Sequence, residues 1–274
     1  MTDARTALEA IGALPDTEID IADAALQLAR IDAPRADWEG CRAHLSLLAR
    51  EAVDFAAGIA DDDAASQAAA LAELLAVRNG YQGDAETYDD LANANLIRVI
   101  ERRRGLPVAL GVIWLHAAHA AGWDAHGIDF PGHFLVALAG GRAPAAVDPF
   151  GGGALLDAAA LRALLRRIEG EAAELRPGLL APMSVRAVLL RLQNNIALRR
   201  HAAGDVAGAA ACVGDMLRSA PLEPGLWWQA ARLHGDLGQL AAALRCLDRF
   251  VELVPPAQAA QAQAAMQALR SRLN

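Results

Sequence analysis

The chain of 274 residues contains no lysine, because all 25 of its basic residues are arginines. Schiff-base chemistry and Walker-type phosphate loops both need a lysine amine, so the sequence excludes these two classes of enzyme. Aromatic residues make up only 4% of the chain, although 54% of it is hydrophobic. Much of that apolar content is alanine, which accounts for 66 residues and favours helices.

Cysteine is also scarce, with only Cys41, Cys212 and Cys246. Three widely spaced cysteines give no disulfide framework and are typical of a reducing compartment. The first twenty residues carry acids and no unbroken apolar stretch, and no run reaches eighteen apolar residues. We therefore expect a cytoplasmic protein that has no membrane partner and needs no cofactor.

The net charge of −8 argues against general nucleic-acid binding, but the charge is unevenly spread. Residues 1–182 carry 15 arginines and 27 acids, a balance of −12, whereas residues 183–274 carry 10 arginines and 6 acids, a balance of +4. This contrast indicates two regions with different partners.

The pattern along the chain predicts an α+β protein that is mostly helical. Apolar residues at three- and four-residue spacing predict helices over 16–79, and the texture changes after the glycines of 80–83. Helices are expected at 93–104, 108–121 and 157–168, with short antiparallel strands at 125–130, 134–138 and 145–147. We therefore expect an N-terminal helical part over 1–84 that packs on an α+β core with a small antiparallel sheet over 85–182.

Residues 183–274 contain a repeat. Five positions recur 34 residues later in the same order: Gly204, Asp205, Ala209, Cys212 and Pro221 become Gly238, Gln239, Ala243, Cys246 and Pro255. This is the period of the tetratricopeptide repeat. The second unit places large, small and glycine residues where that repeat has them, and 257–273 is expected to cap the open end. The sequence thus predicts a C-terminal tetratricopeptide-type module.

The residues most suggestive of chemistry are His133, which opens one predicted strand, and Asp148, which closes another. If those strands pair, the carboxylate can orient the imidazole and fix its tautomer. A catalytic pair and a structural histidine tied to a carboxylate both fit these residues.

Two other patterns favour simpler interpretations. A metal site can be drawn through His116, His119, His126 and His133, but no acid completes a metalloprotease signature, and core histidines are the favoured interpretation. The glycines 151–153 resemble a phosphate-binding loop without its lysine, so a tight turn is the better account. No metal site is therefore predicted.

Three motifs in order carry a resemblance to a known family: N-x-x-L-x-x-V-I-E-R-R-R-G-L-P over 93–107, P-G-H-F over 131–134 and D-P-F-G-G-G over 148–153. With them, nearly the whole chain resembles the bacterial SirB-type transglutaminase-like family, which has C-terminal tetratricopeptide repeats. The resemblance implies a papain-like core. In active members a cysteine at the start of the core helix attacks a carboxamide or peptide carbonyl, a histidine acts as the base and an aspartate orients it. His133 and Asp148 match the last two.

The sequence departs from this family pattern at the nucleophile. Leu106, Pro107, Val108 and Ala109 stand where the cysteine belongs. From Tyr88 to Met183 there is no Cys, Ser or Thr, so the core holds no side chain for an acyl-enzyme route.

Arginines of the repeat region are candidates for binding a protein or peptide partner. Repeat stacks present a concave face to extended peptides, and arginine binds carboxylates in a bidentate manner. We select Arg191, Arg199 and Arg200, together with Trp227 at a large position of its repeat, as candidate binding residues. The alternative is that these arginines only form the solvated face of a lysine-free protein.

Two functions follow. The first is a non-catalytic cytosolic adaptor or regulator that binds a protein partner through its repeats. The second is a hydrolase of amide or ester bonds in which His133 and Asp148 activate water, an effect worth about 10²–10⁴-fold in rate.

Overall fold

The computed structural model of the protein describes residues 3–60, 62–140, 144–176 and 178–273. Internal contacts divide the chain into two units. The core unit comprises residues 15–192, and the helical unit joins residues 1–14 to residues 193–274. None of the helices in the described ranges is both long and apolar enough to span a lipid bilayer.

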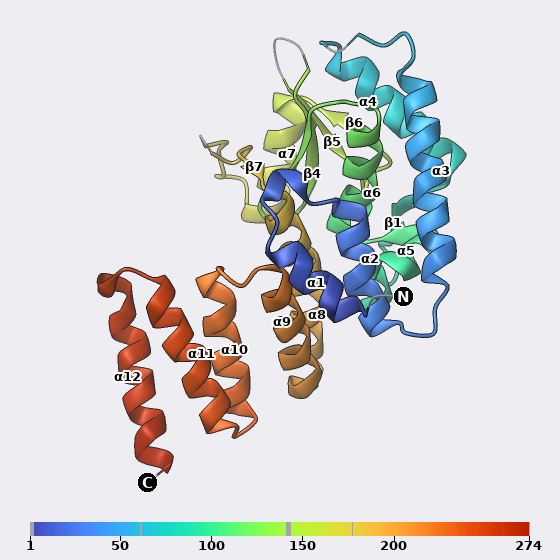
Figure 1. The fold of residues 1–274 in the computed structure, drawn as a ribbon. Helices are drawn as coiled ribbons and strands as arrows, with labels where there is room; N and C mark the ends of the chain where they lie inside the picture. Colours follow the sequence, from blue (N-terminus) through green and yellow to red (C-terminus); the bar gives the residue numbers. More distant parts are fainter. Residues whose placement is uncertain (1–2, 61, 141–143, 177, 274) are drawn as a thin grey trace. The chain divides into compact units, whose positions relative to one another are not determined.

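The core unit contains the sheet and most of the helices (Figure 1). Its α-helices are α2 (Ile21–Asp32), α3 (Trp38–Ala56), α4 (Ala64–Ala72), α5 (Leu96–Arg102), α6 (Pro107–Ala120) and α7 (Ala158–Glu169). Short helical turns lie at η1 (Asp16–Glu18), η2 (Glu73–Arg78) and η3 (Leu91–Asn93). Helix α8 (Val185–Ala202) begins in this unit and continues into the other.

The sheet is antiparallel, as the sequence predicts. Its strands are β3 (Ala125–Ile128), β4 (Leu135–Leu138), β5 (Ala145–Asp148), β6 (Ala154–Leu156) and β7 (Pro182–Met183), in the order β6-β5-β4-β3-β7. The three predicted strands are therefore confirmed, and the two edge strands are additions. A separate parallel pair joins β1 (Gln82–Gly83) to β2 (Arg104–Gly105).

Helix α6 forms the centre of the core unit because it is apolar on every face. Pro107 occupies its first turn, where a missing N–H costs nothing. The helix contacts α2 and α3 as well as β3 and β4. Helix α7 packs on the sheet through Leu161 and Leu165, which join Ile128 and Leu135 in one buried cluster.

The predicted helix over 93–104 is shorter in the structure. It is α5, which begins after Asn95, whose side chain accepts a hydrogen bond from the backbone N–H of Arg98. It ends at Arg103, which has a φ of 58° and is the only non-glycine residue with a positive φ in the part of the chain that the structure describes. A left-handed residue at this position stops the helix.

The helical unit consists of α1 (Ala4–Gly12), the end of α8, α9 (Val206–Ser219), α10 (Pro224–Asp236), α11 (Leu240–Leu253) and α12 (Pro256–Leu273). Helices α9 and α11 are offset by 34 residues at both ends, since 206 + 34 = 240 and 219 + 34 = 253. The turns before them use Gly204 and Gly238, both with positive φ. The 34-residue sequence period thus coincides with a repeat of helix boundaries.

The N-terminal helix α1 packs on α9 within the helical unit. Leu8 is fully buried, and the guanidinium of Arg5 donates to both carboxylate oxygens of Asp215 at 2.8 and 3.1 Å. A Cβ on Gly12 would lie 2.2 Å from the carbonyl oxygen of Arg218, so the two backbones touch at this point. This contact joins residues about 200 positions apart into one unit, which the sequence reading assigned to separate regions.

We expect Gly12→Ala to lower the free energy of unfolding by about 1–3 kcal/mol, because the added methyl group forces α1 away from α9. Urea unfolding followed by circular dichroism measures the change. Gly214→Ala in α9 is the matched control: nothing lies within 4 Å of its Cβ position. That variant should gain about 0.5–1 kcal/mol from helix propensity. Equal effects of the two variants would disprove the close contact.

Candidate functional site

Asp148 is the last residue of β5, and His133 lies in the turn two residues before the neighbouring strand β4. His133 Nε2 is 2.9 Å from Asp148 Oδ1. Because a carboxylate can only accept, Nε2 carries the proton and the neutral ring leaves Nδ1 as an acceptor. The side chains are 13% and 17% exposed. The structure therefore brings together the two residues singled out in the sequence.

The turn after Asp148 wraps around its carboxylate. The backbone N–H of Phe150 donates to Oδ1 at 2.9 Å, and that of Gly153 donates to the Asp148 carbonyl oxygen at 2.8 Å. A Cβ at Gly153 would lie 2.3 Å from the Trp114 ring, and its φ of 85° also favours glycine. The glycine run is thus a tight turn, as expected from the sequence, and it holds the carboxylate in place.

Two aromatic rings that sequence reasoning missed line one side of the pair. Phe150 packs edge-on against His133 with ring centroids 6.2 Å apart, and Tyr88 packs edge-on against Phe150 at 5.9 Å. A Cβ on Gly83 would lie 2.4 Å from the Phe150 ring, so β1 supports that ring directly. Phe150 belongs to the D-P-F motif, so the sequence offered a signal that it lies beside Asp148. Tyr88 belongs to none of the three motifs, so nothing in the sequence indicated that it lies near His133.

Arg191 contacts the same site from α8. Its guanidinium donates to the His133 carbonyl oxygen, forms an ion pair with Asp129 and lies 5.7 Å from the centre of the Phe134 ring. Burial lowers the pKa of Arg191 from its usual value. Among the described contacts, this arginine fixes the backbone that carries the imidazole. Its predicted role in partner binding stays a prediction.

The start of α6 presents no reactive side chain. Leu106 caps the helix with its backbone, is 1% exposed, and donates its N–H to the Asn93 carbonyl oxygen at 2.9 Å. Pro107 has no N–H to offer. The three cysteines are all buried, and burial raises the pKa of the Cys41 thiol to about 11. A thiol with that pKa is a poor nucleophile at neutral pH.

Two residues of the motif over 93–107, Asn93 and Arg102, fix the loop that carries Tyr88. The carboxylate of Asp84, which is 2% exposed, accepts from the backbone N–H and hydroxyl of Thr87 and from Arg102 at 2.8 Å. Arg102 also reaches the Asn93 side chain, and Asn93 donates to the Thr87 carbonyl oxygen. This network fixes the loop 84–93, which carries Tyr88.

A second buried cluster surrounds the left-handed Arg103. Its guanidinium contacts His44 Nε2 and the Tyr81 hydroxyl and stacks 4.7 Å from the centre of the Tyr81 ring. Burial, reinforced by Arg103, lowers the pKa of His44 to about 4, so the imidazole is neutral and accepts. Burial raises the pKa of Tyr81 to about 12. The cluster holds β2 and α5 against α3.

The other candidate binding residues lie in the helical unit. Arg199 donates to the Asn195 side chain at 2.9 Å, and Arg200 donates to the Gly208 carbonyl oxygen at 3.1 Å. Trp227 is half-buried and donates from Nε1 to the Pro221 carbonyl oxygen at 2.9 Å. Each therefore has an internal partner, and contact with another protein stays a prediction.

The histidines considered as metal ligands are held apart by other contacts. His116 and His119 each donate from Nε2 to a backbone carbonyl, those of Leu45 and Ala125. Across residues 3–60, 62–140, 144–176 and 178–273, no three metal-ligating side chains gather at one point.

We expect Asp84→Asn to lower the free energy of unfolding by about 1–3 kcal/mol at pH 7, because it weakens hydrogen bonds to a charged group. Hydrogen bonds from Thr87 hold the pKa of Asp84 at about 2, below its usual 3.8. The stabilisation is present above the unfolded-state pKa and is lost as the pH falls from about 4 to about 2. Urea unfolding at several pH values measures it. Asp54→Asn on exposed α3 surface is the control, and a variant deficit that persists undiminished at pH 2 would contradict the assignment.

The family model described as "Transglutaminase-like superfamily" matches residues 40–194. A UPF0162 protein of Xylella fastidiosa (strain Temecula1) is 34% identical over 190 residues, which cover 68% of each chain. UPF0162 proteins of Vibrio cholerae and Pseudomonas aeruginosa are each 32% identical, over 58% and 54% of each chain. No solved structure matches the chain. The chain belongs to the transglutaminase-like superfamily.

Proposed function

We propose that this protein is a non-catalytic member of its superfamily that acts as a cytosolic adaptor or regulator, of the SirB type, through C-terminal tetratricopeptide repeats. One observation carries the proposal: a well-formed His133–Asp148 pair stands within a stretch, Tyr88 to Met183, that has no Cys, Ser or Thr to act as a nucleophile. The core keeps its fold and the pair keeps its geometry, but covalent acyl transfer has no attacking atom.

The hydroxyl groups that flank the nucleophile-free stretch support this interpretation. Thr87 donates its hydroxyl to the buried Asp84 at 2.6 Å, and the Ser184 hydroxyl accepts from the backbone N–H of Ala187 at the start of α8. Both side chains are engaged in local structure. Cys41 donates weakly to the Ile97 carbonyl oxygen from a buried position, which suits packing rather than chemistry.

The boundaries and packing of the C-terminal helices support a repeat module. The 34-residue offset of α9 and α11 matches the tetratricopeptide period. Ala230, Ala231 and Ala243 are buried, at 3%, 5% and 0% exposure, where α10 and α11 pack together. Small residues at these positions let two helices approach closely, which is how such repeats pair.

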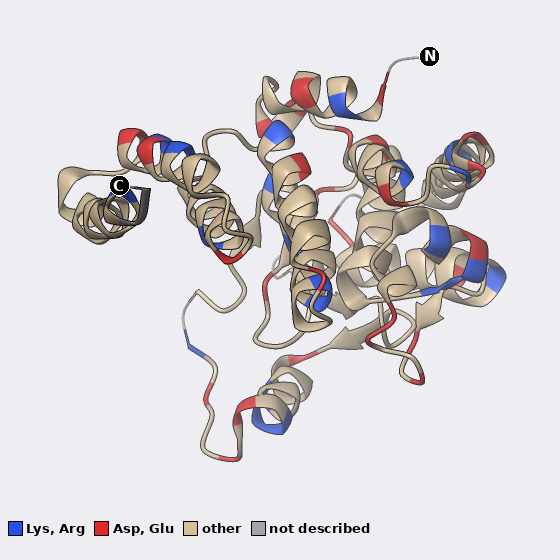
Figure 2. Ribbon diagram, turned by 90° about the horizontal axis from the view of Figure 1, so that it is seen from below, with Lys and Arg blue, Asp and Glu red and all other residues tan. Residues whose placement is uncertain are grey.

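A protein or peptide is the partner that the charge favours. Basic and acidic residues alternate along the sequences of α9, α10 and α11 and form no basic run. Figure 2 likewise shows blue and red positions mixed on the helices. Nucleic acid needs a basic stripe, whereas an acidic peptide can be bound by a few arginines. The balance of +4 over 183–274 suits the second case.

A hydrolase is the second candidate, and one observation favours it. His133 Nδ1 has no hydrogen-bond partner among the described residues, whereas Nε2–H is fixed by Asp148. A neutral imidazole oriented in this way is a general base that can take a proton from water.

A panel of activated esters and amides tests the choice between the two functions. We expect wild-type protein and His133→Ala to give the same rates, both equal to buffer, because no nucleophile is present. Asp148→Asn keeps the shape of the pair and serves as the matched variant. If wild type turns over an ester about 10²-fold or more faster than both variants, the adaptor proposal fails in favour of the hydrolase.

Affinity capture with the full chain tests the role of the repeats. We expect Arg199→Gln with Arg200→Gln to lose partners that wild type retains, because these two arginines are the proposed ligands of the partner's carboxylates. Arg166→Gln with Arg167→Gln in α7 changes the charge equally in the core unit and should retain them. Quantitative mass spectrometry of the captured proteins, with thermal unfolding to check each fold, provides the measurement. Partners lost only with the α7 pair would place the interface on the core unit instead.

A further inference from the structure

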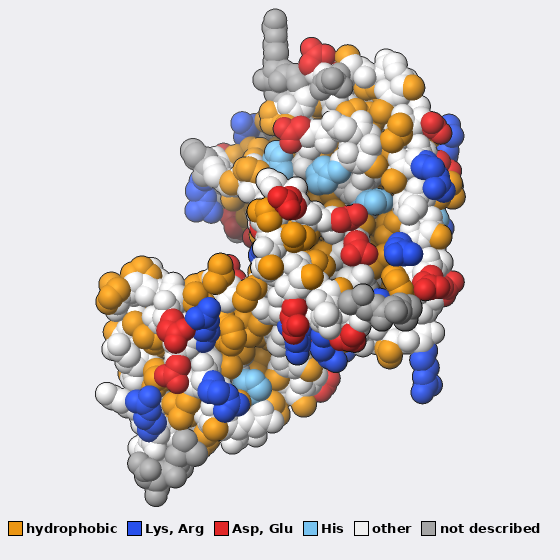
Figure 3. Space-filling view, in the orientation of Figure 1, with side chains coloured by type: hydrophobic (Ala, Val, Ile, Leu, Met, Phe, Trp, Pro, Cys, Tyr) orange, Lys and Arg blue, Asp and Glu red, His pale blue; other side chains and the backbone are white. Residues whose placement is uncertain are grey.

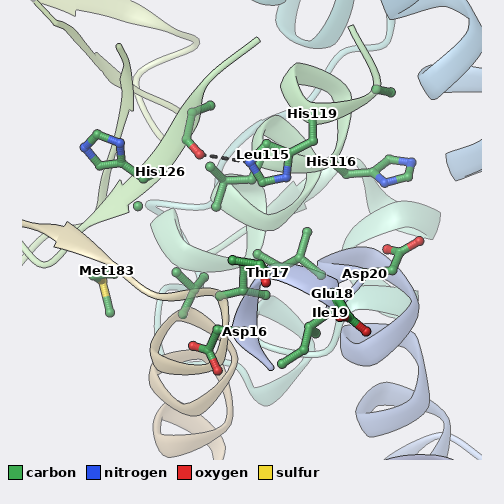
Figure 4. A pocket seen from close by; sticks show the side chains of 16 residues that line it. Asp16, Thr17, Glu18, Ile19, Asp20, Leu115, His116, His119, His126 and Met183 are labelled. Carbon is green, nitrogen blue, oxygen red and sulfur yellow. Dashed lines mark hydrogen bonds between the residues drawn. The ribbon is translucent and has the colours of Figure 1, made fainter. Parts of the chain in front are cut away.

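The core unit contains a cavity of about 680 Å³ that the His133–Asp148 pair does not line. It lies between the segment 16–21, the C-terminal half of α6 and the beginning of β3, with β7 and the start of α8 completing it (Figure 4). Figure 3 shows histidine side chains gathered on one face of this unit beside acidic ones. The cavity therefore has no part in either of the two functions proposed above.

The walls of the cavity are apolar on one side. Leu115 and Val188 are almost fully buried, at 2% and 1% exposure, and Met183 adds a flexible thioether. Such a wall suits a short alkyl or similar apolar body.

The polar side of the cavity carries negative charge. Glu18 and Asp20 are exposed, and Asp20 uses Oδ1 to cap α2 through the N–H groups of Ala22 and Asp23. Asp16 is already neutralised by Arg186, whose Nε lies 3.0 Å from its Oδ1. The described lining residues include no arginine, and the chain has no lysine. A cation from outside therefore meets two carboxylates and neither an arginine nor a lysine of the lining.

His119 adds a hydrogen-bond acceptor to this side. Its Nε2–H donates to the Ala125 carbonyl oxygen at 2.9 Å, so the neutral ring presents Nδ1 as an acceptor. Figure 4 shows this ring over the middle of the cavity, with Glu18 and Thr17 on the opposite side.

We propose that this cavity binds a small organic primary ammonium ion with a short apolar body. The ammonium group would donate to Glu18, Thr17 and His119 Nδ1, while the alkyl part packs on Leu115 and Val188. Primary ammonium has three donors and no acceptor, which complements a lining whose free polar atoms are mainly acceptors. The site is separate from the His133–Asp148 pair and does not depend on the proposed function.

Titration of full-length protein with n-butylammonium chloride, followed by two-dimensional NMR and calorimetry, tests the proposal. We expect saturable binding with a dissociation constant on the order of 1 mM, as suits so small a ligand. The uncharged n-butanol should bind at least about tenfold more weakly, because it cannot use the carboxylates. Tetramethylammonium, which has the charge but no donor, should bind about fivefold more weakly. Equal binding of butanol would overturn the proposal.

Three variants locate the site. Glu18→Gln should weaken n-butylammonium binding about three- to tenfold, and Thr17→Val should weaken it about threefold. Ala120→Leu, which fills the cavity from α6 without changing charge, should abolish saturation. Glu39→Gln on exposed α3 surface is the matched control and should leave binding unchanged. Unchanged affinity in both Glu18→Gln and Ala120→Leu, or loss of binding in the control, would place the ammonium elsewhere and refute the site.

Discussion

Helix α6 has no polar face to present to water, and most of the core unit can be understood as its enclosure. Eleven of its residues are buried, so α2 and α3 must pack against it as well as the sheet. The two polar side chains near its end, His116 and His119, each satisfy one nitrogen with a backbone carbonyl. The N-terminus of α6, capped by Leu106, is therefore the end that lacks a nucleophile, and its C-terminal half lines the proposed ammonium cavity.

Two hydrogen-bonded networks around arginines also stabilise the core unit. The buried carboxylate of Asp84 pairs with the partly exposed Arg102, and Thr87 and Asn93 complete this network. Arg103 contacts His44 and Tyr81. Buried ionic groups need their polar atoms satisfied, so Arg102 fixes the loop 84–93, and Arg103 holds β2 and α5 against α3. The E-R-R-R-G motif that marked the family resemblance therefore has a structural role in this chain. Arg102 fixes the loop that carries Tyr88, Arg103 joins α5 to α3, and neither has a described hydrogen bond to His133.

Local signals predicted the strands and the His133–Asp148 pair well, because glycine and proline bound each strand and a hairpin register follows from strand order. They failed for Tyr88 and Arg191. Tyr88 contacts Phe150 because the ion pair between Asp84 and Arg102 fixes the loop 84–93. The spacing of apolar residues along the sequence carries no information about such a pair. Arg191 was grouped with the repeats because α8 is helical throughout, although its guanidinium lies against His133. Tertiary contact decided both cases.

Because α1 packs on α9, it must wait for a distant part of the chain during synthesis on the ribosome. Gly12 emerges 194 residues before Val206, the first residue of the helix that it packs against (206 − 12 = 194). At typical elongation rates the wait lasts about 10–40 s, during which Leu8 and Ile11 have no native surface to cover them. Residues 15–192, which form the core unit, come between α1 and α9 in the sequence and can complete their own contacts in that time. Helix α1 therefore reaches its native contacts with α9 only long after its own synthesis, when the core unit can already be folded.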